Sequence, residues 1–548
     1  MKHAIQHILL LYTDRYYLIK PVYPFGLDLV ARQLRRAGYK VTLDYPFLPH
    51  AEPQKNLKDL LVRTQPDLIG LGLRNLDTTM SCEPYGNVKT KDFQALSFIP
   101  DLQALVAAIK SLCPHTPLIA GGGAFTVAPE AIMALLGIDF GIAGEGQAAL
   151  LQFVQAYPDT ASYAHIPNLV YKAANEYRQN PRRAFTFAGY GHFSHRAPRF
   201  NYAHETAGLP VQTKRGCNRH CSYCVEPFIE GRQFILRNPE DVVMELEALA
   251  DTSPDAQTIF FVDTEFNTPD LNHCSTIIEH ILKNSLQQRF RFASQFLPRP
   301  FNAALADLLS RAGFTIILTA DSFADQVLEQ NGIAFRHKDI IAAIELCQRF
   351  GIDCTINLIF GLPGETRQTL DQTIAWIDRY PPDHRRRYEY TCGARIYPQT
   401  PLYQRMEPAS QNPHVYGSPS GGYLAPCFYC APIGPKALKK WLDERLPFAL
   451  DFHNDYDTIT QQVMATGYLA DGELWDQAVA QFKASALAAQ ATGYLYLVKK
   501  LASAGQMTHV RAILLHLMER IKLDDRAGQY AEAQPVIQYY LNILATRE

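Results

Sequence analysis

Three closely spaced cysteines, Cys217, Cys221 and Cys224, restrict the possible folds of this chain more than any other feature. The spacing CxxxCxxC places three thiolates on one loop, with no fourth cysteine nearby. Iron–sulfur clusters are normally held by four cysteines, so three of them leave one iron open to a small-molecule ligand. Zinc is the alternative, but zinc sites favour paired cysteines and four ligands in total. The spacing therefore favours a 4Fe-4S cluster.

The residues around these cysteines carry a family resemblance. Arg215 and Gly216 precede the first cysteine, and the aromatic Tyr223 precedes the last. This pattern resembles the radical SAM superfamily. The resemblance implies that the open iron chelates the amino and carboxylate groups of S-adenosylmethionine (SAM), and it places Tyr223 among the cofactor-binding residues.

Length and composition indicate a large intracellular enzyme. A chain of 548 residues suggests about three or four domains. The net charge of -2 gives no electrostatic footprint for nucleic acid, so no nucleic-acid partner is expected. The apolar run 8–11 is too short for a signal peptide, and no stretch has the length to span a membrane. Eleven cysteines in such a chain are interpreted as reduced thiols, which predicts a cytoplasmic location.

The first 155 residues alternate short apolar runs with amphipathic helices. Such alternation predicts an α/β domain, a doubly wound (Rossmann-like) parallel sheet that binds ligands at the carboxyl ends of its strands. Helices are expected at 26–37, 102–112 and 129–136, and strands at 8–12, 40–43, 67–73, 117–120 and 140–143.

Two groups of glycines directly follow the last two of these strands. They are Gly121-Gly122-Gly123, with Thr126 close behind, and Gly144-Glu145-Gly146. Glycines there allow close approach of the backbone to a ligand, where a helix N-terminus favours phosphate. On spacing alone, ordinary tight turns explain these glycines equally well.

The order of the motifs strengthens the binding interpretation. Gly26 within 23–27, then 121–126, then 144–146 resembles the cobalamin-binding domain that precedes some radical SAM cores, and the resemblance covers residues 1 to about 435. It implies a cofactor role for these glycines, Thr126 and Glu145. One departure concerns the motif D-x-H-x-x-G, which supplies a histidine to cobalt. Here Asp14 is followed by no histidine until His50, so a histidine ligand is not expected.

The third strand instead runs into Arg74-Asn75-Leu76-Asp77, at the expected place of the lower corrin face. Arginine stays protonated and has no lone pair to donate, so Arg74 would repel cations there and could not ligate cobalt. A salt bridge from Arg74 to Asp77, or a bond to a corrin amide, is an equally good interpretation. This segment resembles the subgroup of tryptophan 2-C-methyltransferases, which implies cofactor contacts for Arg74, Asn75 and Asp77 and a catalytic role for Arg74.

After a connector at 156–205, the strand–helix alternation resumes across 206–435. Six parallel strands with crossover helices would form a partial (β/α)6 barrel with its site at the strand C-terminal ends. The strands are expected at 209–214, 258–262, 289–295, 314–320, 353–360 and 388–396.

Polar or glycine-rich segments follow several of these strands. Each could be ordinary turn chemistry. In the radical SAM superfamily, corresponding strand ends bind SAM, although for Gln295 and Arg395 we favour purely structural hydrogen bonds. The resemblance assigns cofactor contacts to Asp263, Glu265, Gln295, Asp321, Ser322, Gly361, Pro363 and Arg395.

Glu265 supports two hypotheses and one plain alternative. It could accept a hydrogen bond from the SAM amino group, or it could ligate the open iron and keep SAM from chelating there. The second arrangement suits an enzyme that uses SAM only as a methyl donor, and it makes Glu265 a catalytic residue. The plain alternative is pairing with Arg291 or capping of a helix.

The last part of the chain carries a second CxxC at Cys427 and Cys430. A four-cysteine site would have to borrow a ligand such as Cys392, so structural or substrate-lining thiols are favoured. Residues 436–548 have helical apolar spacing and predict a helical domain that covers the active site or forms a dimer contact.

These features together predict a cobalamin-dependent radical SAM methyltransferase that passes a methyl group from SAM, via methylcobalamin, to a carbon of a small molecule such as an amino acid. The expected cofactors are a 4Fe-4S cluster, SAM and cobalamin, and the expected electron donor is of the flavodoxin or ferredoxin type. A non-methylating enzyme of the same architecture (an oxidative cyclase or a 3-amino-3-carboxypropyl transferase) is the alternative. A sensor without turnover is the third candidate.

Overall fold

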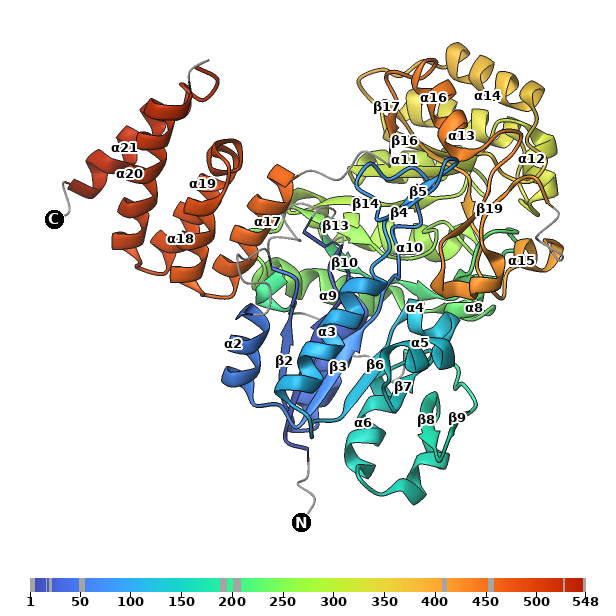
Figure 1. Cartoon of the computed structure of the whole chain (residues 1–548). Coiled ribbons are helices and arrows are strands. Elements are labelled where there is room, and N and C mark those ends of the chain that lie inside the picture. The colour runs from blue at the N-terminus through green and yellow to red at the C-terminus, as the bar shows by residue number, and fades with distance from the viewer. Residues whose placement is uncertain are drawn as a thin grey trace.

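The computed structural model describes residues 5–15, 17–18, 22–48, 55–187, 195–200, 208–406, 412–451, 458–525 and 528–545. Parts of the predicted connector (188–194 and 201–205) lie outside the described residues. The chain forms an N-terminal α/β domain, a partial barrel and a row of C-terminal helices (Figure 1). The α/β fold class is confirmed, whereas the exact domain boundaries stay predictions.

The N-terminal sheet has the five parallel strands expected from the apolar runs, in the order β2-β1-β3-β6-β7. Their central members are buried on both faces, as their continuous apolar sequences require. Two antiparallel strands from the predicted connector, β8 and β9, extend the sheet. The strands are β1 (His7–Tyr12), β2 (Lys40–Asp44), β3 (Leu68–Gly72), β6 (Leu118–Gly121), β7 (Phe140–Ile142), β8 (Leu169–Ala173) and β9 (Glu176–Gln179).

Helices cover both faces of this sheet. Helices α1 (Phe25–Arg36) and α6 (Gln147–Ala156) pack together on one face. Helices α2 (Lys55–Thr64), α3 (Ile99–Leu112) and α5 (Pro129–Leu136) bury their apolar sides against the other, and the short α4 (Gly123–Val127) follows β6. A doubly wound domain of this kind places its ligand at the carboxyl ends of the strands.

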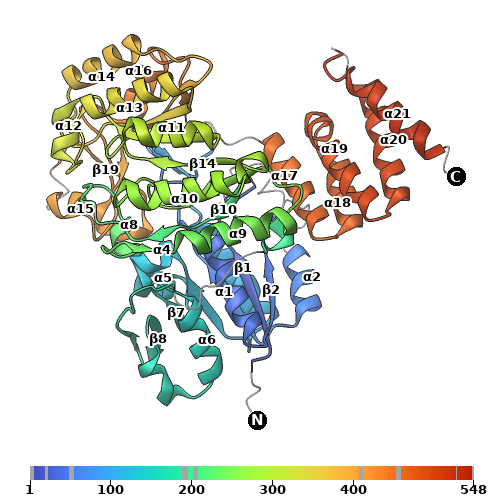
Figure 2. The same cartoon turned by 180° about the vertical axis from the view of Figure 1, so that it is seen from behind.

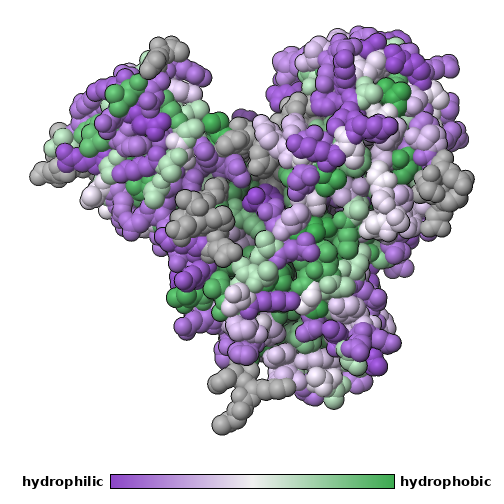
Figure 3. Space-filling view, viewed as in Figure 1, coloured by the Kyte–Doolittle hydropathy of each residue, from purple (hydrophilic) through white to green (hydrophobic). Residues whose placement is uncertain are grey.

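A hollow of about 440 Å³ lies between α2 and α3, where Figure 3 shows an apolar surface over α2. Gln65 and Thr116 line it, and these residues precede β3 and β6. The hollow is therefore at the amino ends of the strands, opposite the edge where the sequence predicts the site.

The segment between β3 and α3 leaves the N-terminal domain and reaches the barrel, which the sequence did not indicate. It contains the hairpin β4 (Val88–Lys89) and β5 (Gln94–Ala95), which lies beside the barrel in both Figure 1 and Figure 2. Ser81 Oγ donates to the carbonyl of Cys392 at 2.5 Å. The rings of Phe93 and Phe428 lie 5.4 Å apart. This hairpin segment (73–98) therefore joins the two domains.

The barrel sheet runs in the order β10-β13-β14-β15-β16-β17-β21, with all neighbours parallel. Its first six strands are those expected, and β21 adds a seventh. They are β10 (Leu209–Val211), β13 (Thr258–Phe261), β14 (Arg291–Phe296), β15 (Phe314–Asp321), β16 (Asp353–Phe360), β17 (Arg386–Cys392) and β21 (Leu450–Asp451).

Two strand ends differ from the expectation. The first strand stops at Val211, and Lys214–Arg215 instead form β11, which pairs antiparallel with β12 (Ile235–Leu236). The last strand stops at Cys392, because Gly393 adopts a φ of 72°. The chain then continues in a separate small sheet made of β18 (Ala394–Arg395), β19 (Val415–Gly417) and β20 (Cys427–Tyr429).

Burial along the barrel strands alternates with period two, which separates an outer and an inner face. In β16, Ile356 and Leu358 are buried in the core beneath the helices, whereas Asn357 between them points the other way and is less buried. Gln295 of β14 and Thr319 of β15 follow the same pattern. The outer helices are α9 (Pro239–Thr252), α10 (Leu271–Lys283), α11 (Ala303–Arg311), α12 (Asp325–Gln330), α13 (His337–Phe350), α14 (Arg367–Arg379) and α16 (Pro435–Asp443).

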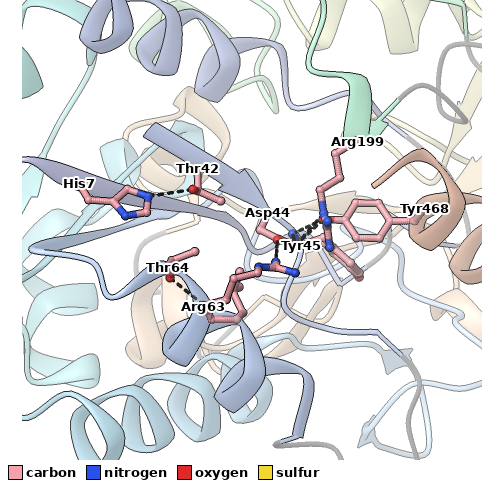
Figure 4. Close-up of polar contacts among 9 residues, drawn as sticks. His7, Thr42, Asp44, Tyr45, Arg63, Thr64, Arg199 and Tyr468 are labelled. Atoms are coloured by element: carbon pink, nitrogen blue, oxygen red, sulfur yellow. Dashed lines mark hydrogen bonds and ion pairs between the residues drawn. The ribbon is translucent and has the colours of Figure 1, made fainter. Parts of the chain in front are cut away.

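The C-terminal helices form an arm that stands away from the barrel in Figure 1. Figure 4 shows its anchor at the end of β2, where the Tyr468 hydroxyl donates to Asp44 at 2.6 Å and accepts from Arg199 Nε at 2.8 Å. No described helix is both long and apolar enough to cross a membrane. The arm consists of α17 (Thr458–Asp471), α18 (Trp475–Ala484), α19 (Leu487–Ser503), α20 (Met507–Asp524) and α21 (Ala533–Ala545).

Candidate active site

The carboxyl-end loops of the N-terminal sheet meet the cysteine loop of the barrel. Glu145, which follows β7, forms an ion pair of 2.7 Å with Arg215, just before the first cysteine. Arg182 donates to the carbonyls of Phe228 and Ile229 at 2.7 and 2.6 Å. These two carbonyls belong to the short helix α8 (Glu226–Ile229), which lies beside α4 in Figure 2. The two predicted cofactor sites therefore face each other across one interface.

The cysteine loop is shaped by its backbone. Gly216 has a φ of 92°, and a Cβ atom there would lie 2.1 Å from the carbonyl oxygen of Gln233. Only glycine fits, which explains why Gly216 precedes Cys217. The Cys217 amide then donates to the Gly231 carbonyl at 3.0 Å, and the Cys224 amide to that of Cys221 at 3.2 Å.

The charges around the three thiols suit a cationic cluster. Burial raises the pKa of each of the three thiols. Neighbouring carboxylates raise these pKa values further. They are Glu265 beside Cys217, Asp321 and Glu265 beside Cys221, and Glu226 beside Cys224. Three thiolates among carboxylates need a compensating cation, which iron supplies. Among the described residues no three His, Cys, Asp or Glu converge closely enough to hold a single metal ion.

Glu265 lies beside these thiols with one carboxylate oxygen unused. Its Oε2 is buried and accepts no hydrogen bond. Burial raises the pKa of this carboxyl group, while Lys214 and Arg219 oppose the shift. No ion pair with Arg291 is formed, and Arg291 begins β14 at the far end of the strand. An orphaned buried oxygen next to the cysteines fits both hypotheses for Glu265, the iron ligand and the SAM contact.

Tyr223 and Asp321 are brought together although 98 residues separate them. The Tyr223 hydroxyl donates to Asp321 at 2.5 Å, which ties the cysteine loop to the end of β15. Burial raises the pKa of the Asp321 carboxyl to about 6. Ser322, next in the chain, accepts from the Ala324 amide at 3.1 Å and thus shapes the following turn.

Other predicted site residues are occupied by the fold itself. Asp263 accepts from the amides of Thr213 and Lys214 at 2.8 and 3.1 Å and fixes the strand that leads to the cysteines. Thr126 accepts from the Gly144 amide at 2.8 Å and donates to the Gly122 carbonyl at 2.9 Å. Thr126 thus joins the two glycine loops, and its hydroxyl proton is already used within the protein.

The glycine loops are tightly packed against the chain that carries Arg74. A Cβ atom on Gly122 would lie 2.4 Å from the Leu73 carbonyl oxygen, and one on Gly123 would lie 3.5 Å from that of Arg74. Packing explains Gly122 without a ligand. Beside Gly26, in contrast, the structure leaves open space.

Arg74 forms a salt bridge, but not to the expected partner. Its Nη1 atom lies 2.9 Å from Asp14, whereas Asp77 pairs with Arg395 at 3.0 Å. The guanidinium is desolvated by the surrounding protein, although Asp14 keeps its pKa above the ordinary value. Yet 47% of the side chain remains accessible. Arg74 is therefore bonded to Asp14 on one side, while about half of its side chain stays accessible to a ligand.

Arg395 is fully engaged in structural bonds. Besides Asp77, it donates to the carbonyls of Ile396, Cys427 and Tyr423 at 2.9, 3.3 and 3.0 Å. Asp77 belongs to the hairpin segment, so this buried ion pair links the two domains. The structural interpretation that we favoured for Arg395 agrees with this geometry.

The remaining predicted residues lie around the same edge. Gln295 is on the inner barrel face. Gly361 has a φ of 92°, and a Cβ atom there would lie 2.7 Å from the Cys430 sulfur, so this thiol is packing for the turn. The Pro363 carbonyl accepts from Asn331 at 2.8 Å. Asn75 follows Arg74 and is partly buried, and Gly146 precedes α6.

Glu226 and Asp14 were missed by the sequence analysis. Burial, with Glu230 adding to it, raises the pKa of Glu226 to about 7, and Arg74 and Arg215 act against the shift. Glu226 is thus affected by the charge of Arg74 in one domain and itself raises the pKa of Cys224 in the other. Its position two residues after Cys224 was the only available signal.

Comparison with known families now adds to this geometry. Residues 211–377 match the radical SAM superfamily, and residues 20–154 match the B12 binding domain. Residues 211–377 therefore carry a radical SAM domain and residues 20–154 a B12-binding domain. The predicted order, a cobalamin-binding domain before a radical SAM core, is thereby confirmed.

Two curated relatives are methyltransferases. The chain is 26% identical to tryptophan 2-C-methyltransferase of Streptomyces laurentii, over 64% of this chain and 67% of the relative. It is 24% identical to the uncharacterized methyltransferase PH0819 of Pyrococcus horikoshii, over 56% and 66%. The chain thus spans about two thirds of the length of these relatives.

Two solved structures share the fold. One is the radical S-adenosylmethionine methyltransferase TsrM from Kitasatospora setae, solved with cobalamin and a 4Fe-4S cluster. Its TM-score is 0.71 and its sequence identity 19%, and the match covers 86% of this chain and 99% of that one. The cobalamin-dependent S-adenosylmethionine radical enzyme OxsB has a TM-score of 0.63 at 13% identity over 99% and 84%. At these identities the likeness concerns the fold.

Proposed function

We propose that this protein is a cobalamin-dependent radical SAM methyltransferase that methylates a carbon of a small molecule. The observation that carries the proposal is the direct contact between the B12-binding side and the cysteine loop, where Glu145 pairs with Arg215 at 2.7 Å and Arg182 bonds the helix that follows the cysteines. The two methyltransferase relatives support methyl transfer over other uses of SAM.

The cofactors have fitting residues in this proposal. Cys217, Cys221 and Cys224 hold the 4Fe-4S cluster, and the space above Arg74 holds the corrin. Cobalamin supplies a carrier for the methyl group between SAM and the acceptor carbon. The protein supplies placement, and Arg74 offers a fixed positive charge without a lone pair. With cobalamin bound, that charge would repel cations near the corrin, and Arg74 itself could not act as a ligand of cobalt.

Glu265 fits best as a ligand of the open iron. Its Oε2 is buried and accepts no hydrogen bond, so this oxygen can bind a cation, and its charge acts on both Cys217 and Cys221. An iron ligand there blocks chelation by SAM and leaves SAM as a methyl donor. The variant Glu265→Gln should then change the electron paramagnetic resonance (EPR) spectrum of the reduced cluster and let SAM alter it. An unchanged spectrum in Glu265→Gln would contradict the ligand role and leave the SAM-contact hypothesis.

The small-molecule substrate is expected on the polar inner face of the barrel. Gln295, Thr319 and Asn357 point to this face, and Asn357 Oδ1 is buried without a hydrogen-bond partner. The Kitasatospora enzyme has been solved with tryptophan and a SAM analogue. An amino acid is therefore the first substrate class to test.

An acidic electron donor of the flavodoxin or ferredoxin type fits the surface next to the cysteine loop. His220 and Arg232 are exposed there, 3.5 Å apart. The exposed Arg405 donates to the Gln330 carbonyl, in the turn that packs on the His220 backbone. The two exposed arginines, Arg232 and Arg405, give a negatively charged donor a surface to bind beside the cysteine loop.

The decisive experiment is anaerobic reconstitution with iron, sulfide and cobalamin, followed by addition of SAM, reductant and tryptophan. S-adenosylhomocysteine is the expected SAM product, and absence of 5′-deoxyadenosine would support Glu265 as an iron ligand. Methylthioadenosine, or 5′-deoxyadenosine without S-adenosylhomocysteine, would overturn methyl transfer in favour of the non-methylating alternative.

A further inference from the structure

Asp14 occupies the place from which a cobalamin motif would orient a histidine, and here it holds an arginine. Its side chain is 2% exposed and accepts from Arg74 Nη1 at 2.9 Å. The Tyr12 hydroxyl donates to the same carboxylate oxygen at 3.3 Å. The carboxylate is thus fixed from one side by a tyrosine and binds the arginine on the other.

The strand register makes this pairing a consequence of the sheet. Strands β1 and β3 are parallel neighbours in which Tyr12 is opposite Gly72. Asp14 and Arg74 each come two residues later, so they leave the sheet side by side. Thr13 donates to the Gly72 carbonyl from both its amide and its hydroxyl, at 3.3 and 3.1 Å, which keeps the two chains together beyond the last pair.

Arg74 has a second carboxylate within electrostatic reach. Glu226 belongs to the cysteine side of the interface. Its charge helps to raise the pKa of Arg74, and the charge of Arg74 acts to lower the pKa of Glu226. The arginine is therefore bonded to Asp14 and also lies within the electrostatic influence of Glu226. The bond to Asp14 decides which way the guanidinium points.

We propose that Asp14 is the positioning residue that holds the Arg74 guanidinium under the corrin and keeps the lower cobalt face without a ligand. An Asp–Arg pair built from two neighbouring strands thus replaces the Asp–His pair of the common motif. This inference rests on the proposed binding of cobalamin. Outer-shell partners of metal sites typically affect affinity or activity about 10- to 100-fold.

Removing the charge of Asp14 should release Arg74 without removing it. In Asp14→Asn the guanidinium loses its ion-pair partner, and we expect it to turn toward the remaining carboxylate of Glu226. Water then reaches the lower cobalt face. Arg74→Gln should open the same face directly.

The test uses the full chain loaded with hydroxocobalamin and reduced to the Co(II) state. EPR distinguishes four-coordinate from five-coordinate Co(II), and a titration gives the cobalamin affinity. We expect a four-coordinate signal in the native protein, and five-coordinate signals in Asp14→Asn and Arg74→Gln. Affinity should fall about tenfold in Asp14→Asn. The double variant should resemble Arg74→Gln alone, since Asp14 acts only through Arg74.

The matched control is Asp101→Asn, which removes an exposed aspartate that pairs with Arg15 at 3.2 Å. It should leave the signal four-coordinate. If Asp14→Asn does not fold, the double variant carries the test, because it removes both charges of the pair together.

Three results would overturn the inference. They are an unchanged four-coordinate signal in Asp14→Asn, a five-coordinate signal in the native protein, or a further change in the double variant beyond that of Arg74→Gln. Failure of the native chain to bind cobalamin at all would instead refute the proposed function.

Discussion

Replacing Asp77 by asparagine should destabilise the protein far more than breaking a similar pair on its surface. Asp77 and Arg395 lie 3.0 Å apart with side chains only 6% and 2% exposed. Asp77 also accepts from the Thr79 amide at 2.8 Å. An asparagine keeps the shape but leaves the Arg395 charge buried without a counter-ion.

The expected cost follows from what Arg395 retains. Breaking a buried ion pair by removing one partner costs about 3–5 kcal/mol, because the other charge stays uncompensated. Arg395 still donates to three carbonyl oxygens, of Ile396, Cys427 and Tyr423. We therefore expect the lower end of the range, about 3 kcal/mol.

The control is the pair between Arg311 and Asp307, at 3.1 Å but 59% and 49% exposed. It joins the same residue types across one helical turn, where such pairs contribute about 0.3–0.5 kcal/mol. Urea unfolding of the cofactor-free protein, followed by circular dichroism, measures Asp77→Asn and Asp307→Asn side by side. An unchanged slope against urea shows that stability itself has changed.

A third variant separates lost contact from unpaired charge. Asp77→Leu combined with Arg395→Met removes both charges, and apolar replacement of a buried pair is often neutral or stabilising. The double variant should therefore be more stable than Asp77→Asn. The reasoning is refuted if Asp77→Asn costs no more than Asp307→Asn, or if the double variant is at least as unstable as Asp77→Asn.

Three further predictions concern other parts of the chain. Gly216→Ala should abolish iron loading, measured as iron per chain, whereas Gly313→Ala, with positive φ but open space, should keep it. Burial raises the pKa of Glu365 to about 7, so the folded state binds the proton more tightly than the unfolded state and stability should fall as pH rises from about 4.5 to 7. Glu365→Gln should flatten that pH dependence of unfolding, and an equally steep profile would contradict it. Tyr468→Phe should lower the free energy of unfolding of the arm by about 1–3 kcal/mol, because Asp44 and Arg199 lose a buried hydrogen-bond partner. Limited proteolysis of the arm measures the effect, and the buried control Tyr494→Phe should change it little.

Local patterns in the sequence were enough for the elements and their order. Apolar runs and their spacing predicted both sheets, and the cysteine spacing predicted the loop between β10 and β13. The order of motifs predicted the B12-binding and radical SAM architecture that the family matches confirm.

Partnerships between distant residues could not be predicted in this way. Proximity in sequence suggested Asp77 as the partner of Arg74, but the sheet register brings Asp14 to it instead, and Asp77 bonds Arg395. The hairpin segment was also missed, because two strands of two residues each carry no periodicity. The raised pKa of Glu226 depends on burial and on charges from both domains, which the sequence around Glu226 does not indicate.

The hairpin segment has a consequence for the order of events during synthesis. Asp77 leaves the ribosome 318 residues before its partner Arg395. At roughly 5–20 residues per second, the segment waits about 16–64 s for its binding surface. During that time Phe93, which later stacks near Phe428, has no barrel to cover it. A nascent chain whose synthesis stops before Arg395 therefore exposes an aromatic hairpin, which chaperones and proteases can bind.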